Sequence, residues 1–186
     1  FKGREDLGIT LALVPRNTKG LVIGKRHDPM GAPFQNGPVS GEGMFIPMEC
    51  IIGGKKQIGQ GWRMLMECLS AGRGISLPSL SIGAAQLSTR ACSAYALVRE
   101  QFGMPIGKFE GVRERLARLA ASTYTMSATG RFTASAVDAG EKPSVASAIA
   151  KAYLTEGMRT ALDDGMDIMA GAAICKGPHN ILARPY

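Results

Sequence analysis

Residues 95–107 read Tyr95-Ala-Leu-Val-Arg99-Glu-Gln-Phe102-Gly-Met-Pro-Ile-Gly107, and they close a longer stretch that begins at Trp62. Before Phe102, apolar residues recur at three- and four-residue spacing, which lines up one stripe of a helix. The stripe consists of Leu80, Ala84, Leu87, Ala91, Ala94, Tyr95 and Val98. We expect this stripe to be buried. We expect the helix to end at Phe102, because Gly103 can adopt a left-handed conformation and Pro105 cannot continue a helix.

Arg99 and Phe102 lie three residues apart at the predicted end of this helix. Helical residues at that spacing share a face, so a cation and an aromatic ring would be presented together. The pattern predicts a binding site for a ligand that carries both an anionic group and a ring.

Residues 1–61 carry strand and turn signals. Short apolar runs occur at 7–14, 20–24, 44–46 and 51–52, each bounded by Gly or Pro. Runs of this kind are typical of short strands joined by tight turns. We therefore expect a small β domain that is marginal as an independent core and that completes a sheet begun before Phe1. The absence of an initial Met and of a capped terminal element indicates a fragment.

Residues 62–186 show helical periodicity in three runs. The first, 62–102, contains Gly72, Gly74 and Pro78, so it is either one kinked helix or two helices that meet. The second begins near Phe109, with apolar positions at 112, 116, 119, 123 and 126 and with residues 113–115 turned away from them. The third follows Pro143, with apolar positions at 145, 149, 152, 153, 162 and 166.

The predicted fold class is α+β. A partial antiparallel β domain, residues 1–61, is followed by an up-down antiparallel helical bundle, residues 62–186, in which three long helices are present.

The net charge of +7 would allow binding to a polyanion such as a nucleic acid. The basic residues, however, occur in small groups interleaved with acidic ones, and no RNP-like aromatic motif accompanies them. This distribution favours solvated faces with a few anion contacts and argues against nucleic acid as the partner. A phosphorylated cofactor would also explain the excess charge.

The four cysteines are scattered without C-x-x-C spacing, which predicts neither a zinc site nor a disulfide framework. No apolar run approaches the roughly 18 to 20 residues that span a bilayer, and no leader opens the chain, so we expect a soluble protein of a reducing cytoplasm.

Common signatures of nucleotide-binding proteins and hydrolases are absent. His27 and His179 have no evident metal or nucleophile partner, so a surface or structural role is favoured. Asp163, Asp164 and Asp167 near a helix end are expected to be solvated or ion-paired. The small residues of the segment 165–177 leave two alternatives open, a turn that touches a ligand or tight helix packing.

Several pieces of the sequence, in order and spacing, resemble acyl-CoA dehydrogenases, most of all the large bacterial members that act in fatty-acid β-oxidation. The pieces are residues 8–15, 18–24, 45–53, 59–69, 72–74, 99–103 and 105–107. The resemblance implies the later half of a central β domain and most of three helices of a C-terminal four-helix bundle, in a family that holds FAD between subunits.

Individual residues take expected roles from this resemblance. Arg99 and Phe102 match an R-x-x-F-G motif that contacts the adenosine diphosphate part of FAD held by a neighbouring subunit. Arg73 matches an arginine that meets the CoA portion of the substrate, and Gly171 matches a glycine that lies against the partner's FAD. The matches are incomplete, because Ser70, Asp167 and Ala170 replace residues that are common in the family.

The resemblance also implies a reaction. The substrate acyl-CoA loses its α proton to a glutamate and a hydride to FAD, which gives a trans-2-enoyl-CoA, and an electron-transfer flavoprotein receives the electrons. We expect a homodimer or homotetramer in the bacterial cytoplasm, with peripheral membrane association left open. The glutamate would follow Tyr186, or it would occupy the position of Gly72, which cannot act as a base. We therefore assign no catalytic residue and no metal to this chain, and we expect it to be inactive alone.

Two other functions stay open at this point. A DNA-associated flavoprotein of the same fold would retain DNA in a salt-dependent manner. A purely structural or interaction module would keep the same flavin content after Arg99→Ala.

Overall fold

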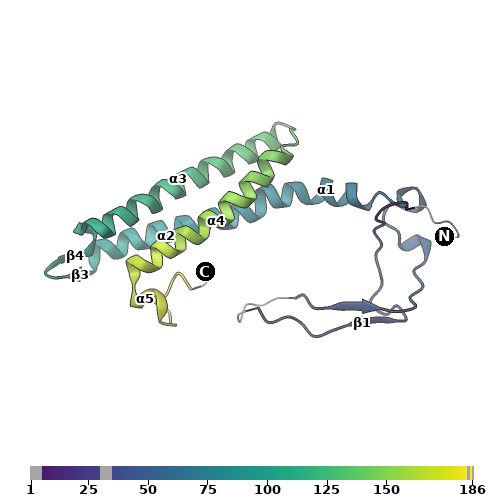
Figure 1. Cartoon of the computed structure of the whole chain (residues 1–186), viewed down its shortest axis with the longest axis horizontal. Coiled ribbons are helices and arrows are strands. Elements are labelled where there is room, and N and C mark those ends of the chain that lie inside the picture. The colour runs from purple at the N-terminus through teal and green to yellow at the C-terminus, as the bar shows by residue number, and fades with distance from the viewer. Residues whose placement is uncertain (1–5, 30–34, 184, 186) are drawn as a thin grey trace. The chain divides into compact units, whose positions relative to one another are not determined.

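The computed structural model describes residues 6–29, 35–183 and 185 (Figure 1). The chain divides into two compact units, Phe1–Glu67 and Cys68–Tyr186. The assignment of residues 1–61 and 62–186 as the β domain and the bundle domain stays a prediction.

The N-terminal unit contains little regular structure. Strand β1 (Leu21–Ile23) pairs antiparallel with β2 (Val39–Gly41), with Val22 opposite Ser40. The predicted runs 7–14 and 51–52 meet only in an isolated antiparallel bridge between Ala12 and Ile51. The run 44–46 forms no strand and leads instead into the 3₁₀ turns η1 (Met48–Cys50) and η2 (Lys55–Gln57). Extended segments become strands only where a partner backbone lies alongside, and most of these runs have none here.

Apolar side chains of this unit stay outside a core. Among its described residues only Gly61 is buried. The exposed large apolar residues of the unit are Leu7, Ile9, Leu13, Val14, Val22, Ile23, Val39, Phe45, Ile46, Met48, Ile52, Trp62 and Met66.

A long helical run occupies residues 61–98. Helix α1 (Gly61–Ala71) passes through one π-helical turn, η3 (Gly72–Ser76), into α2 (Leu77–Val98) without a break. Proline lacks an N–H and its ring clashes with the carbonyl four residues earlier, which for Pro78 belongs to Gly74. The wider π-helical turn absorbs this conflict one turn before the proline. Of the two alternatives left by the sequence, the continuous irregular helix is therefore observed.

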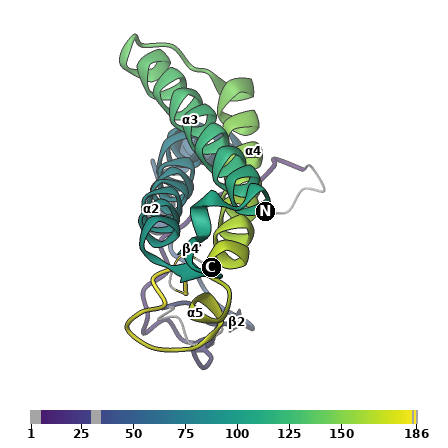
Figure 2. The ribbon, with the colours of Figure 1, turned by 90° about the vertical axis from the view of Figure 1, so that its left-hand side faces the viewer.

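Three long helices form the second unit, in up-down order (Figures 1 and 2). Helix α2 is followed by a short hairpin, β3 (Glu100–Gln101) and β4 (Met104–Pro105), and by the 3₁₀ turn η4 (Ile106–Lys108). The chain returns in α3 (Glu110–Asp138), turns again into α4 (Ser144–Met169), and continues in the short α5 (Gly171–Ile174). The predicted bundle with three long helices is confirmed.

The face that α2 buries differs from the predicted stripe. Leu80 and Val98 are 71% and 78% exposed, so this prediction is wrong. The buried face lies one position along the helix, at Pro78, Ser81, Ala85, Ser88, Cys92 and Ala96. Most residues of this buried face are small, because small side chains let the helices approach closely. The Ser88 hydroxyl donates to the Ala161 carbonyl at 3.1 Å, so burying it leaves no polar atom without a partner.

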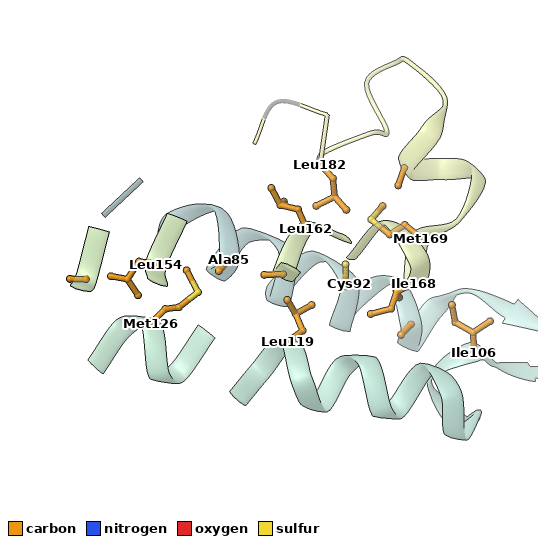
Figure 3. Packing of buried hydrophobic residues seen from close by; sticks show 14 residues of the cluster. Ala85, Cys92, Ile106, Leu119, Met126, Leu154, Leu162, Ile168, Met169 and Leu182 are labelled. Carbon is orange, nitrogen blue, oxygen red and sulfur yellow. The ribbon is translucent and has the colours of Figure 1, made fainter. Parts of the chain in front are cut away.

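The other two helices meet in a shared core with α2 (Figure 3). On α3 the predicted positions Leu119, Thr123 and Met126 are buried, which confirms that stripe. On α4 Leu162 is buried as predicted. The predicted positions Val145, Ile149 and Tyr153 are exposed instead, and the neighbouring Ser147, Ala150 and Leu154 are buried.

Candidate functional site

The chain leaves α2 through a hairpin, not through a helix cap. Arg99 is already extended, with φ −76° and ψ 122°. Phe102 and Gly103 then form a two-residue turn between β3 and β4, with φ of +54° and +77°. Two successive positive φ values are typical of a type I′ hairpin turn. The predictions that the helix ends at Phe102 and that Arg99 and Phe102 share a helix face are therefore wrong, although Gly103 is left-handed as expected.

Phe102 holds a strained position in this turn. Among the described non-glycine residues only Phe102 and Ala170 have a positive φ. The left-handed region costs an L-residue about 1 to 2 kcal/mol. Phe102 is 91% exposed, so its ring is not buried within the unit and the free-energy cost of the strain is not offset by apolar burial. Strain retained at an exposed aromatic residue points to a role outside the fold's own packing.

The base of the hairpin is fixed to the bundle. The Ile106 N–H donates to the Arg99 carbonyl at 2.8 Å, and Ile106 itself is buried. Gly107 lies so close to α2 that an added Cβ would be 3.0 Å from the Ala96 carbonyl oxygen. The exposed turn of Phe102 and Gly103 therefore belongs to a hairpin whose base is fixed to the bundle.

Arg99 is exposed at the start of the hairpin and forms no ion pair with any residue that the structure describes. Its backbone is fixed, since its N–H donates to the Tyr95 carbonyl at 2.8 Å. The structure thus places the two predicted residues, Arg99 and Phe102, in one short hairpin at one end of the bundle (Figure 1). A guanidinium group suits a phosphate and a ring suits an aromatic base, and the binding role expected of these two residues stays a prediction.

Helix α5 lies at the same end of the bundle (Figures 1 and 2), and Gly171 is its first residue. It follows Ala170, whose φ is +49° and ψ is −127°. An added Cβ at Gly171 would meet nothing within 4 Å, whereas one at Gly165 would lie 2.4 Å from the Ser88 hydroxyl oxygen. Both alternatives for the segment 165–177 therefore have support, with tight packing at Gly165 and open space at Gly171.

Of the acidic residues near this end of α4, Asp164 and Asp167 are ion-paired and Asp163 is exposed, as expected. The buried Asp164 carboxylate accepts hydrogen bonds from Arg115 at 3.0 Å and from Arg118 at 3.2 Å. These hydrogen bonds, that of Arg118 first, lower the pKa of Asp164 against the opposing effect of burial. Arg115 also pairs with Asp167 at 2.6 Å. The prediction that Arg115 turns away from the apolar stripe of α3 is wrong, because it binds α4 across the helix interface.

A groove runs along the exposed face of α2. It has a volume of about 590 Å³ and is lined by Ser76, Ser79, Leu80, Gly83, Ala84, Leu87, Ile181 and Pro185. Part of the stripe predicted to be core, Leu80, Ala84 and Leu87, therefore forms its wall. Arg73 is exposed in the preceding π-helical turn, and such turns are frequent at functional sites.

Within residues 6–29, 35–183 and 185, no group of three or more His, Cys, Asp or Glu side chains could hold a metal ion. The four cysteines are free. No helix in the same part of the chain is long and apolar enough to cross a membrane.

Comparison with known proteins identifies the family. The family model for the acyl-CoA dehydrogenase C-terminal domain matches residues 59–186. This match covers more than half of the chain, and the chain belongs to the acyl-CoA dehydrogenase family.

Individual relatives match parts of this chain. Protein HemX of Proteus mirabilis is 54% identical over 90 residues, which cover 48% of this chain and 53% of that protein. The mitochondrial short-chain specific acyl-CoA dehydrogenase of Rattus norvegicus is 33% identical over 120 residues, covering 64% of this chain and 28% of that protein. The chain thus spans about half or less of these relatives.

The fold has a close counterpart among solved structures. The crystal structure of an acyl-CoA dehydrogenase from Geobacillus kaustophilus superposes with a TM-score of 0.85 at 22% sequence identity. The superposition covers 97% of this chain and 46% of that one.

Proposed function

We propose that this chain is part of an FAD-dependent acyl-CoA dehydrogenase that oxidises fatty acyl-CoA to trans-2-enoyl-CoA in β-oxidation. The observation that carries the proposal is the hairpin of residues 99–105, which offers a guanidinium group without an ion pair among the described residues and a strained, exposed ring. Family membership makes FAD the ligand to be tested at this hairpin.

FAD would be held at this end of the bundle by charge and by ring contact. Arg99 would donate to the diphosphate oxygens, and Phe102 would lie against the adenosine part. Gly171 would allow the cofactor to approach the backbone where a side chain would otherwise intervene. Asp167 would repel a nearby phosphate less than a free carboxylate does, because it forms an ion pair with Arg115, which also pairs with Asp164. FAD supplies the hydride acceptor when it is bound.

The acyl-CoA substrate would use Arg73 and the groove on α2. Arg73 would pair with a phosphate of CoA, and the fatty acyl chain would follow the apolar side chains of the groove. From Ser76 to Leu87 the helix advances about 16 Å at 1.5 Å per residue. Gly83 and Ala84 line the groove and leave room for a ligand, whereas their neighbour Ala85 is fully buried in the core.

The proposal assigns no base to residues 1–186. Gly72 precedes Arg73 and carries no side chain that could take a proton. The acidic residues Asp164 and Asp167 are engaged in ion pairs. The whole protein would supply the carboxylate that removes the α proton, and it would act as a homodimer or homotetramer that passes electrons to an electron-transfer flavoprotein.

The direct test is flavin reduction in the whole encoded protein. Anaerobic addition of acyl-CoA substrates, from butyryl-CoA to palmitoyl-CoA, should bleach the oxidised flavin absorbance, and an electron-transfer flavoprotein should restore it. Residues 1–186 alone should bleach no flavin with the same substrates. A whole protein that carries flavin and keeps it oxidised with every acyl-CoA would contradict the proposal.

A further inference from the structure

The turn fixes the backbone of Phe102 but not the direction of its ring. An exposed phenylalanine can adopt several rotamers, and only some of them would present the ring face to a ligand. In the structure the Phe102 ring meets the Phe109 ring edge to face, with centroids 6.1 Å apart and planes at 89°. These values lie in the preferred range for aromatic pairs.

Phe109 is held more firmly than Phe102. It is the residue that precedes α3, its N–H donates to the Ile106 carbonyl at 3.0 Å, and its carbonyl accepts from the Arg113 N–H at 2.9 Å. Its side chain is half-buried and packs against the bundle core. The pair therefore joins a fixed ring to a ring at an exposed turn.

This contact adds little to the stability of the fold. Phe102 remains 91% exposed with the pair formed, so little apolar area leaves water. What the contact does change is the freedom of the Phe102 ring. Restricting a side chain before binding removes part of the entropy that binding would otherwise cost.

We propose that Phe109 is a positioning residue that orients the Phe102 ring for contact with the adenosine part of FAD. This inference rests on the proposed function, because it names the hairpin as the FAD site. Phe109 acts through Phe102 and does not touch the cofactor itself.

The test compares single and double variants of the whole encoded protein. FAD affinity is measured by titrating the apoprotein, and apoprotein stability by its melting temperature. Phe109→Leu keeps an apolar side chain but removes the ring, and we expect about fivefold weaker FAD binding with little change in melting temperature. Phe109→Tyr keeps the ring and should restore the affinity. Phe109→Leu should have no further effect when Phe102→Leu is already present.

The outcomes separate this inference from the proposed function. If Phe102→Leu leaves FAD affinity unchanged, the assignment of the hairpin as the FAD site fails, and the positioning role fails with it. If Phe102→Leu weakens binding but Phe109→Leu does not, only the positioning role is overturned. The positioning role is also overturned if Phe109→Leu weakens FAD binding equally in the unaltered protein and in the Phe102→Leu variant.

A second measurement does not depend on the folding of any variant. A fluorine label on the Phe102 ring of the unaltered apoprotein should give an NMR signal displaced from that of a free phenylalanine by the neighbouring ring. A signal at the free position would contradict the inference.

Discussion

Both units of this chain contain many apolar residues, and they use them differently. In the helical unit Leu119 and Leu162 are 0% and 1% exposed, whereas in the N-terminal unit Leu13 is 71% exposed. A helix satisfies its backbone within one segment, so an amphipathic helix needs only another helix to bury its apolar face. A strand also needs a partner strand for its backbone, and β1 and β2 pair over only three residues each. Local periodicity therefore gives a core in one unit and not in the other.

The largest expected effect separates the two units directly. Leu162→Ala should lower the free energy of unfolding by about 3 kcal/mol, because it opens a cavity in a packed core. Leu13→Ala, the matched change in the N-terminal unit, should lie within about 0.5 kcal/mol of the unaltered chain. Urea unfolding of residues 1–186 measures both. Equal losses would show that Leu13 belongs to a core after all.

The buried ion pair between α3 and α4 gives the next effect. Asp164→Asn removes a buried carboxylate from two arginines, and we expect a loss of about 2 kcal/mol. This expected loss of stability is smaller than that for a fully buried ion pair, because both arginine side chains are partly exposed. Asp163→Asn is the control, since Asp163 is its exposed neighbour. Unfolding in urea should distinguish the two variants, and similar losses would contradict the structural role of Asp164.

The same pair predicts a pH dependence. Since the pKa of Asp164 is lowered in the folded state, its contribution to stability is complete above the unfolded pKa of about 3.9. That contribution is lost as the pH falls through the lower, folded pKa. Acid unfolding curves of the unaltered chain and of Asp164→Asn should therefore converge at low pH. Curves that stay parallel down to complete protonation would refute this account.

The close approach of η3 and α4 gives a smaller effect. An added Cβ at Gly74 would lie 2.6 Å from the Ser147 Cβ, so Gly74→Ala should cost about 1 to 2 kcal/mol. Gly83 lies in α2 with nothing within 4 Å of an added Cβ, so Gly83→Ala should stabilise the chain by about 0.5 to 1 kcal/mol. Thermal unfolding measures both changes in stability. A destabilising Gly83→Ala would show that other side chains crowd this face of α2.

The smallest effect concerns the hairpin. Phe102→Gly should raise stability by up to about 1 kcal/mol, because glycine adopts a φ of +54° without strain. Gly103→Ala should have the opposite sign, since its φ is +77°. Melting temperatures of the two variants provide the comparison. A loss of stability in Phe102→Gly would mean that the ring packs within the fold, which removes the argument that the strain is functional.

Much of the bundle follows from the sequence, because long amphipathic periods act locally. The three long helices, the buried stripe of α3 and the left-handed Gly103 were predictable. The face of α2 was not, because Ser81, Ser88 and Cys92 look polar or neutral in a pattern of apolar residues, while close packing selects them for their small size. The ion pair of Arg115 with Asp164 joins residues 49 positions apart, and no local signal specifies such a contact.

The candidate site was predictable in its residues but not in its geometry. Arg99 and Phe102 were predicted from their spacing and from the family motif, and the structure brings them together in a hairpin of two-residue strands. Strands this short are below the length at which alternation can be recognised. The sequence identifies Phe109 only as the start of a helix, because a contact between rings seven residues apart depends on the turn between them. The roles of Arg99, Phe102, Gly171 and Arg73 in binding stay predictions.

The flavin content of Arg99→Ala tests the central claim most directly. In the whole encoded protein, loss of a guanidinium group that pairs with a diphosphate should weaken FAD binding about tenfold or more, and the flavin-to-protein ratio should fall after dialysis. Arg113→Ala removes another exposed arginine, on α3, and should leave the ratio unchanged. An unchanged ratio in Arg99→Ala would contradict the assignment of the hairpin as an FAD site and would favour a structural or interaction role for the bundle.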